Sequence, residues 1–217
     1  MRRRGFFSGN IFVCALFVFV LGGCISAGSS PASRFYMLRH PDGTAPVKKF
    51  NIPAGLITSI GPVNIPQYLD RPQIVTQNDK GLIDISQFER WGESLDLAIA
   101  QAVNEDLNLM LPGGTFEMFP CNFSIPLDYQ VIVDILRLEA NLKKDLLMVA
   151  QWSIIDAKAK KMLFTSRSEL SEKIEPHNYF GLADALSRSV YSLSVQIAGD
   201  LSELANRPKP DDRDEED

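Results

Sequence analysis

The sequence of 217 residues has few of the side chains on which catalytic and metal sites usually depend, with only two histidines and three cysteines. Neither His40 nor His177 stands at a metal-ligand spacing from a cysteine or from the other histidine. The nucleophile elbow, the Walker loop, the dinucleotide-binding glycines and the H-E-x-x-H pattern are also missing. We therefore expect no catalytic residues, no metal and no cofactor. An envelope hydrolase would require a serine, His177 and an aspartate to converge in the fold, which a sequence does not show.

The sequence also lacks the excess of positive charge that nucleic-acid binding requires. Its formal net charge is -5, from 22 Lys and Arg against 27 Asp and Glu, so we expect no nucleic-acid partner. The last residues, 207–217, contain prolines and a dense run of acids, which is typical of a disordered tail. Those acids are Asp211, Asp212, Asp214, Glu215, Glu216 and Asp217.

No apolar run reaches the ~20 residues of a transmembrane helix. The longest, Ile11 to Leu21, has eleven apolar residues behind three arginines, which is the pattern of a secretory signal peptide. The following Leu21-Gly22-Gly23-Cys24 resembles the lipobox of bacterial lipoproteins, and that resemblance implies removal of residues 1–23 and lipid attachment, such as palmitate, at Cys24. The alternative is an ordinary signal peptide with a chance cysteine at its end.

Two further predictions follow from this N-terminal segment. Residues 24–33 are rich in Ser, Ala and Gly, so we expect a lipidated cysteine on a flexible tether. Residue 25 is Ile rather than Asp, and in the sorting rule of enteric-type lipoproteins this implies the cell outer membrane, facing the periplasm. Once Cys14 is removed and Cys24 is acylated, Cys121 is left without an intrachain partner, and we expect it to be a buried structural thiol.

Residues 34–206 have the pattern of one α+β domain with a mainly antiparallel sheet and two long helices packed on it, in the order β-β-β-β-α-β-β-β-β-α. Strand-like segments recur before and after a central helical segment, and the last three strands are joined by short polar connections, so they should pair antiparallel. The expected strands are 34–39, 56–60 with its continuation to 65, 74–77, 82–85, 115–119, 129–140, 146–155 and 162–170.

The two helices are predicted from capping and periodicity. Ser86-Gln87-Phe88-Glu89 fits a capping box, and apolar residues at helical spacing follow, so we predict a helix over residues 87–110. A second apolar series at helical spacing runs from Tyr179 to Leu201 and predicts a long helix across the sheet. Along residues 146–154, every second residue is apolar, which predicts the sheet face that the helices cover.

One segment closely resembles the signature of a known family. Residues 60–75, Ile-Gly-Pro-Val-Asn-Ile-Pro-Gln-Tyr-Leu-Asp-Arg-Pro-Gln-Ile-Val, are similar to the signature of the ABC-type transport auxiliary lipoproteins, the PqiC/YmbA-like, membrane integrity-associated transporter subunits. The resemblance continues through residues 88–95, 151–156 and 182–187, although Gly92 and Ser94 depart from the usual Ala and Pro.

The resemblance implies a non-enzymatic lipoprotein subunit of an MCE-type system that moves phospholipid or other hydrophobic cargo between membranes. The implied partners are a PqiB-like MCE-domain membrane protein, which the lipoprotein docks at the outer membrane, and in some systems an ABC transporter. The resemblance also implies a homo-oligomeric ring as one form of assembly. The alternative function is a stand-alone outer-membrane lipoprotein that assists the assembly or stability of another envelope protein, without a transport role.

The signature segment contains a candidate partner interface. Pro62, Pro66 and Pro72 each remove a backbone donor, so the residues between the last two should form an irregular exposed loop. Tyrosine and arginine are enriched at interface hot spots, and we therefore expect partner contact at this loop. The alternative is a structural loop in which Asp70 and Arg71 form a local ion pair. The candidate interface residues are Tyr68, Leu69, Asp70 and Arg71.

Overall fold

The structure is a computed structural model that describes residues 31–41, 47–121 and 126–207. Contacts divide the chain into two units, Met1–Ala32 and Ser33–Asp217, and the fold below is that of the second unit. The expected signal peptide, the lipid attachment at Cys24, all but the end of the tether and the acidic tail from residue 208 lie outside the described residues. Among the described helices, none has both the length and the apolar character needed to cross a membrane.

The described ranges contain eight strands and two α-helices, in the order expected from the sequence. The helices are α2 (Leu95–Met110) and α3 (Tyr179–Ala205), and the 3-10 turn η2 covers Gln67–Leu69. The strands are β1 (Arg34–Tyr36), β2 (Leu56–Asn64), β3 (Gln73–Gln77), β4 (Ile83–Trp91), β5 (Gly114–Met118), β6 (Tyr129–Ala140), β7 (Asp145–Asp156) and β8 (Lys161–Lys173).

The strands form two mixed sheets. The larger sheet has the order β5-β2-β6-β7-β8, in which β2 is parallel to both of its neighbours. The smaller sheet has the order β1-β4-β3, in which β1 is parallel and β3 antiparallel to β4. The last three strands, β6, β7 and β8, pair antiparallel as predicted. The α+β class is thereby confirmed, with parallel pairing concentrated around β2 and at β1.

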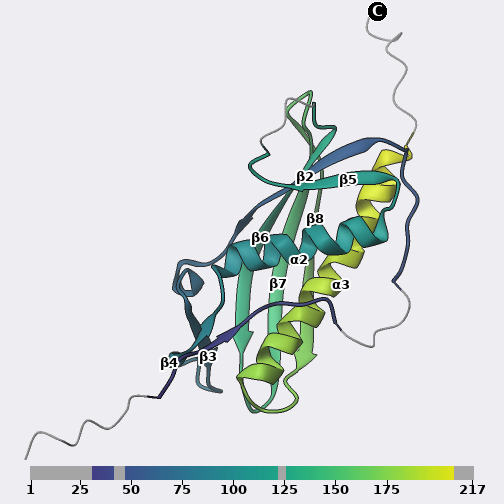
Figure 1. The fold of residues 1–217 in the computed structure, drawn as a ribbon. Coiled ribbons are helices and arrows are strands. Elements are labelled where there is room, and N and C mark those ends of the chain that lie inside the picture. Colours follow the sequence, from purple (N-terminus) through teal and green to yellow (C-terminus); the bar gives the residue numbers. More distant parts are fainter. Residues whose placement is uncertain (1–30, 42–46, 122–125, 208–217) are drawn as a thin grey trace, which may run out of the picture. The chain divides into compact units, whose positions relative to one another are not determined.

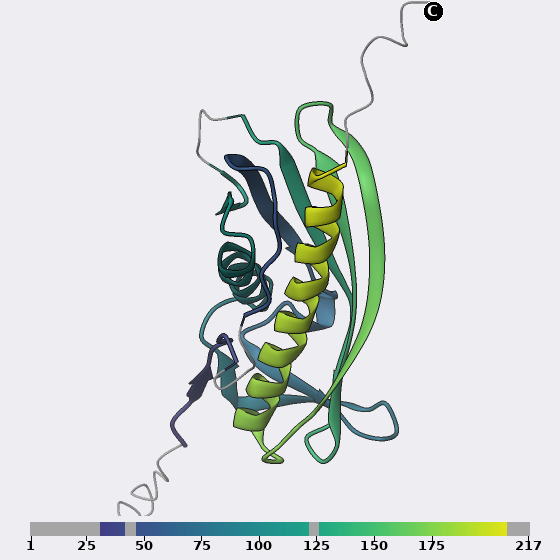
Figure 2. The ribbon, with the colours of Figure 1, turned by 90° about the vertical axis from the view of Figure 1, so that its right-hand side faces the viewer.

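The core lies between the large sheet and the two helices (Figures 1 and 2). Helix α2 packs against β2 and β5, while α3 packs against β7, β8 and α2. The apolar series of the terminal helix is buried as expected, and so is the alternating face of β7. From β7 these buried residues are Leu146, Met148, Ala150, Trp152 and Ile154; from α3 they include Leu182, Leu186, Val190, Leu193, Ile197 and Leu201.

The predicted start of the first helix, residue 87, is wrong. Residues 83–91 form β4, and the helix begins at Leu95 after the N-cap residue Ser94. The Ser86 hydroxyl does accept a hydrogen bond from the Glu89 amide at 3.0 Å, as in a capping box. However, β4 pairs with strands on both sides, and the Glu89 carboxylate binds Arg34 and Tyr36 of β1 instead of capping a helix. Tertiary pairing therefore overrides the local signal. The first strand is also shorter than the predicted 34–39.

Candidate functional site

The loop between β2 and β3 is held in one conformation by its own backbone. Leu69 N–H donates to the Pro66 carbonyl at 2.9 Å, and Arg71 N–H donates to the Leu69 carbonyl at 2.8 Å. At the end of the loop, the Pro72 carbonyl accepts a hydrogen bond from the Trp91 amide at 2.8 Å. The prolines limit backbone rotation and lack an N–H group. The hydrogen bonds above pair some of the other N–H and C=O groups of the loop. The loop is thus irregular, as predicted, but well ordered.

Two of the four candidate interface residues attach the loop to the domain. The Leu69 side chain is 4% exposed and belongs to the hydrophobic core. Tyr68 is half-buried, and its hydroxyl donates to the Leu138 carbonyl of β6 at 3.0 Å. Burial raises the pKa of Tyr68, so the hydroxyl stays protonated and remains a donor. These two residues fix the position of the loop on the sheet.

The other two candidate residues, Asp70 and Arg71, form the accessible part of the loop. Asp70 is exposed and Arg71 is half-exposed. No ion pair joins them to each other or to any other residue in the described ranges, so the local pair considered from the sequence is not formed. The buried Nε of Arg71 has no hydrogen-bond partner among the described residues. The Arg71 guanidinium is thus a half-exposed positive charge that forms no ion pair in the described ranges.

The described residues contain one histidine–aspartate contact, but its arrangement is not that of a hydrolase. His40 Nδ1 lies 3.0 Å from Asp106 Oδ1, and the His40 ring packs edge-on against Tyr191 with centroids 5.1 Å apart. Burial raises the pKa of Asp106, and the hydrogen bond with His40 opposes that rise. A catalytic triad needs a serine hydroxyl on the histidine. Here no described serine hydrogen-bonds His40, and nearby Ser194 donates to the Val190 carbonyl at 2.9 Å.

The remaining titratable candidates are also apart from one another. His177 is exposed in the connection before α3, away from any serine–aspartate pair in the described ranges. Cys121, expected to be buried, is half-buried, and its thiol donates to the Met118 carbonyl at 3.3 Å. Within the described ranges no three His, Cys, Asp or Glu residues come together in a way that could hold a metal ion.

Sequence reasoning missed a charged cluster that attaches β1 to the domain. Arg34 Nε donates to both carboxylate oxygens of buried Glu89 at 3.0 Å, and the Tyr36 hydroxyl donates to Glu89 Oε2 at 2.7 Å. Burial of Glu89 disfavours its ionisation, but the hydrogen bonds from Arg34 and Tyr36 outweigh burial and lower the pKa of Glu89. Burial and the bond to Glu89 raise the pKa of Tyr36 to about 12. The strand next to the tether is therefore firmly held.

An apolar patch beside this cluster was also missed. Phe35 and Met37 are 65% and 61% exposed, and Phe180, at the start of α3, is 53% exposed. They line a shallow pocket of about 240 Å³ between β1 and α3, and the Arg39 guanidinium carbon lies 5.8 Å from the centroid of the Phe180 ring. We call Phe35, Met37 and Phe180 the β1 patch. Polar and apolar residues alternate along 34–37, and this pattern indicates that Phe35 and Met37 share one face. The sequence does not show that Phe180 is part of the same patch.

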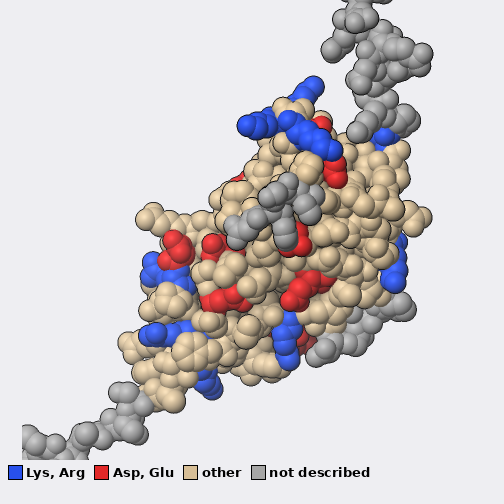
Figure 3. Space-filling view, turned by 45° about the horizontal axis from the view of Figure 1, so that its top comes forward, with Lys and Arg blue, Asp and Glu red and all other residues tan. Residues whose placement is uncertain are grey.

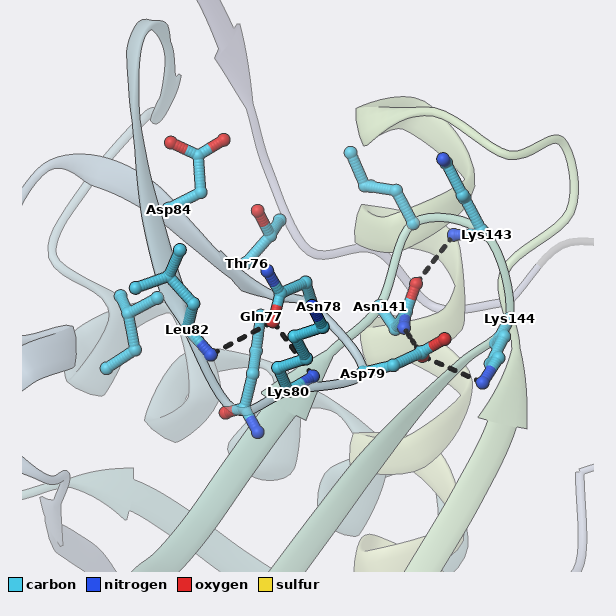
Figure 4. A pocket seen from close by; sticks show the side chains of 12 residues that line it. Thr76, Gln77, Asn78, Asp79, Lys80, Leu82, Asp84, Asn141, Lys143 and Lys144 are labelled. Carbon is cyan, nitrogen blue, oxygen red and sulfur yellow. Dashed lines mark hydrogen bonds and ion pairs between the residues drawn. The ribbon is translucent and has the colours of Figure 1, made fainter.

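A larger open pocket of about 650 Å³ lies between the β3–β4 turn and the β6–β7 turn (Figure 4). Asp79 joins the two turns, since its carboxylate accepts from Asn141 at 2.6 Å and pairs with Lys144 at 2.7 Å. Lys80 and Lys143 also line the pocket, and no ion pair engages either lysine in the described structure. Leu82 and Ile83, on the same lining, are 68% and 44% exposed. The pocket thus combines basic and apolar side chains.

One further face of the domain has no large region of a single charge sign. On the face shown in Figure 3, acidic and basic side chains form separate small groups among broad areas of other residues. Nucleic-acid binding requires a continuous basic face. This face of the domain does not provide one.

Residues 36–198 match the model of a family described as "ABC-type transport auxiliary lipoprotein component". Among curated proteins, no sequence matches the chain. Two of the solved structures that match its fold each cover most of this chain. One, described only as an uncharacterized protein, has a TM-score of 0.64 at 15% identity and covers 79% of this chain and 99% of its own. The other, a DUF330-family protein from Xanthomonas campestris, has a TM-score of 0.63 at 10% identity and covers 79% and 97%.

Proposed function

The chain belongs to the family of ABC-type transport auxiliary lipoprotein components, and from this premise we propose that it is an outer-membrane-anchored subunit of an MCE-type lipid transport system. Its role is to dock the MCE tunnel protein at the outer membrane and so to support membrane integrity. The observation that carries the proposal is the family match, which spans residues 36–198 and includes the whole β2–β3 loop.

The proposed anchor is a lipid on Cys24. Its support is the order of the N-terminal segment, in which arginines, eleven apolar residues and the lipobox-like Leu21-Gly22-Gly23-Cys24 follow one another. Two or more acyl chains hold a protein firmly on a bilayer, whereas a single chain binds only marginally. Ile25 in place of Asp supports the outer membrane as the destination.

The anchor is tested by Cys24→Ala. We expect the variant either to keep its signal peptide or to leave the membrane fraction, while the wild-type chain is found in the outer membrane after separation on a sucrose gradient. Cys121→Ala is the matched control, since this thiol lies in the folded domain, and it should fractionate like the wild type. A Cys24→Ala protein that is cleaved normally and stays in the outer membrane would contradict the proposed anchor.

The proposed docking site is the accessible part of the β2–β3 loop. Leu69 and Tyr68 hold the loop in place, so Asp70 and Arg71 are presented on a fixed backbone. A fixed loop loses little conformational entropy on binding, which favours affinity. Arg71 is half-exposed and has no ion pair within the described structure, and a carboxylate of the MCE protein would supply one.

Docking is tested by co-purification of the MCE-domain protein with charge-reversed variants. Asp70→Lys and Arg71→Glu should each reduce the amount of MCE protein recovered by about tenfold or more, while circular dichroism stays native. Arg167→Glu, at an exposed position on β8, is the matched control and should recover the wild-type amount. Wild-type recovery by both loop variants would contradict docking at this loop. Failure of the wild type itself to recover any MCE protein would favour the stand-alone stability factor instead.

A further inference from the structure

The β1 patch and the lysine-lined pocket, which the proposed docking loop does not explain, lie at the same end of the domain. β1, the first turn of α3, the β3–β4 turn and the β6–β7 turn all lie at the lower end in Figures 1 and 2. The last two turns are joined through Asp79, and the Lys144 carbonyl accepts a hydrogen bond from Ile174, which leads into α3. The β1 patch and the lysine-lined pocket therefore belong to one continuous end of the domain.

Several large apolar side chains are exposed at this end. The three side chains of the β1 patch are each more than half exposed, and Leu82 and Ile83 add to it at the opposite side. A cluster of exposed aromatic and long apolar side chains on a folded domain marks a contact surface. The Arg39 guanidinium lies over the Phe180 ring. An apolar ring with a cation beside it suits the boundary between headgroups and acyl chains, because the ring can enter the apolar side while the charge stays among the headgroups.

The charge of the same end is mixed, and part of it is basic. Two acids at the β1 patch are paired, Glu89 with Arg34 and Asp184 with Arg188, whereas exposed Glu175 has no ion pair in the described ranges. At the pocket, Asp79 is paired with Lys144, and Asp84 is on the same lining as Lys80 and Lys143. Basic residues close to a bilayer are attracted by anionic lipids. The described residues hold 17 Lys and Arg against 20 Asp and Glu, so an attraction to headgroups depends on where the lysines lie and not on net charge.

The length of chain before β1 limits how far the β1 patch can lie from the proposed anchor. Phe35 is eleven residues after Cys24, so even a fully extended segment spans only about 36 Å. The first strand after the anchor in the described ranges is thus the one that carries Phe35 of the β1 patch.

We propose that this end of the domain rests on the bilayer that holds the lipid anchor. The β1 patch enters the boundary between headgroups and acyl chains, and Lys80 and Lys143 face anionic headgroups. The inference rests on the proposed attachment of lipid at Cys24 and adds an orientation to it. With the lower end on the membrane, the opposite end, with the β7–β8 turn, points away from the bilayer.

The test places a tryptophan in the patch of the full lipidated chain. Phe35→Trp protein is reconstituted in vesicles of phosphatidylethanolamine and phosphatidylglycerol whose acyl chains carry bromine, which quenches nearby indoles. The native Trp91 and Trp152 are 5% and 1% exposed, so they contribute little to the change. Met162→Trp is the matched control, because Met162 is 59% exposed at the opposite end of the domain, at the start of β8.

We expect the indole introduced at position 35 to be quenched at least twofold more than the one introduced at position 162. Equal quenching at the two positions, in a protein that floats with the vesicles, overturns this inference and leaves the anchor intact. A protein that does not float with the vesicles overturns the anchor and the inference together. A protein that elutes as a dimer in detergent, and that loses the dimer on Phe35→Glu, has a second copy over the patch and also overturns it.

The lysines are tested in the same assay. The double variant Lys80→Glu with Lys143→Glu, made in the Phe35→Trp protein, should reduce quenching in vesicles that contain phosphatidylglycerol, and should leave it unchanged in phosphatidylcholine alone. Lys160→Glu with Lys161→Glu, at the β7–β8 turn, is the control and should change neither. An equal reduction in both kinds of vesicle would overturn the role of the lysines.

Discussion

The indole N–H of Trp152 donates a hydrogen bond to Oδ2 of Asp200 at 2.9 Å. This bond joins the centre of β7 to the last turns of α3, forty-eight residues later in the chain. Trp152 is 1% exposed, so its N–H has no access to water and needs a protein acceptor. Burial raises the pKa of Asp200, and the bond from Trp152 opposes that rise. The pair therefore fixes the helix on the sheet at a buried, polar point.

Trp152→Phe should lower the free energy of unfolding by about 2 kcal/mol or more, because it leaves the Asp200 carboxylate without its donor and also leaves a cavity. Urea denaturation followed by circular dichroism measures the loss. Asp200→Asn is the control: it keeps an oxygen acceptor for the indole and should cost less than half as much. If both variants unfold at the same urea concentration, the bond is not what stabilises this contact.

Leu69→Ala should lower the free energy of unfolding by about 2–5 kcal/mol, since Leu69 is a core residue inside an exposed loop. Asp70→Ala, one residue later and exposed, should stay within about 0.5 kcal/mol of the wild type. Urea unfolding of the two variants side by side separates the structural half of the loop from its accessible half. A Leu69→Ala protein as stable as Asp70→Ala would contradict the buried position of Leu69.

Glu89 should make the domain sensitive to acid. Its pKa in the folded state lies below its ordinary value near 4.5, so the stability that it contributes is present above that value. This stability is lost as pH falls from about 4.5 through the lower folded-state pKa. Glu89→Gln should be less stable than the wild type at about pH 7, and the difference should shrink on acidification below about pH 4.5.

Urea unfolding at a series of pH values measures the dependence on Glu89. Asp79→Asn is a useful comparison, because Asp79 also has a lowered pKa, from its hydrogen bond with Lys144, but lies at the surface where solvent screens the pair. Its effect should be small at every pH. A constant difference between wild type and Glu89→Gln across the whole range would show that ionisation of Glu89 does not stabilise the fold.

Features that depend on neighbours in the sequence were predicted well. The apolar periodicity of α3 and the alternation in β7 are local, and both led to the correct elements and buried faces. The start of the first helix was not predictable in this way. Ser86 and Glu89 carry the local signal of a helix cap, but pairing with β1, about fifty-five residues earlier, makes the segment a strand. Local patterns do not encode which distant strand supplies that pairing.

The same limit applies to the candidate site. The prolines predicted an irregular loop, and the loop is irregular, but only the structure shows that Leu69 points into the core and that Asp70 and Arg71 form no ion pair within the described ranges. The β1 patch joins Phe35 and Met37 to Phe180, more than 140 positions later. A side chain's partner across such a separation depends on how the helix crosses the sheet. The periodicity of the sequence predicts which face of α3 is buried. It does not predict that Phe180, in the first turn, lies beside Phe35 and Met37.

Two glycines of α3 should respond oppositely to the same substitution. A Cβ on Gly181 would lie 2.0 Å from the Pro176 carbonyl oxygen and 2.9 Å from the Glu175 carbonyl carbon. These are backbone atoms of the segment that leads into the helix, and Asn178 caps this first turn by accepting from the Gly181 amide at 3.0 Å. Neither atom can move without breaking the cap. Gly181→Ala should therefore cost about 3 kcal/mol or more.

Gly199→Ala, in the same helix, is the matched control. Its added Cβ would meet Phe50 Cε1 at 3.5 Å, an ordinary contact, and alanine is the better helix former by about 1 kcal/mol. We expect this variant to be as stable as the wild type or slightly more stable in urea. Equal losses at the two positions would contradict the close packing at the start of α3. Because Phe180 precedes Gly181 directly, a loosened first turn should also reduce the membrane quenching of a tryptophan at position 35.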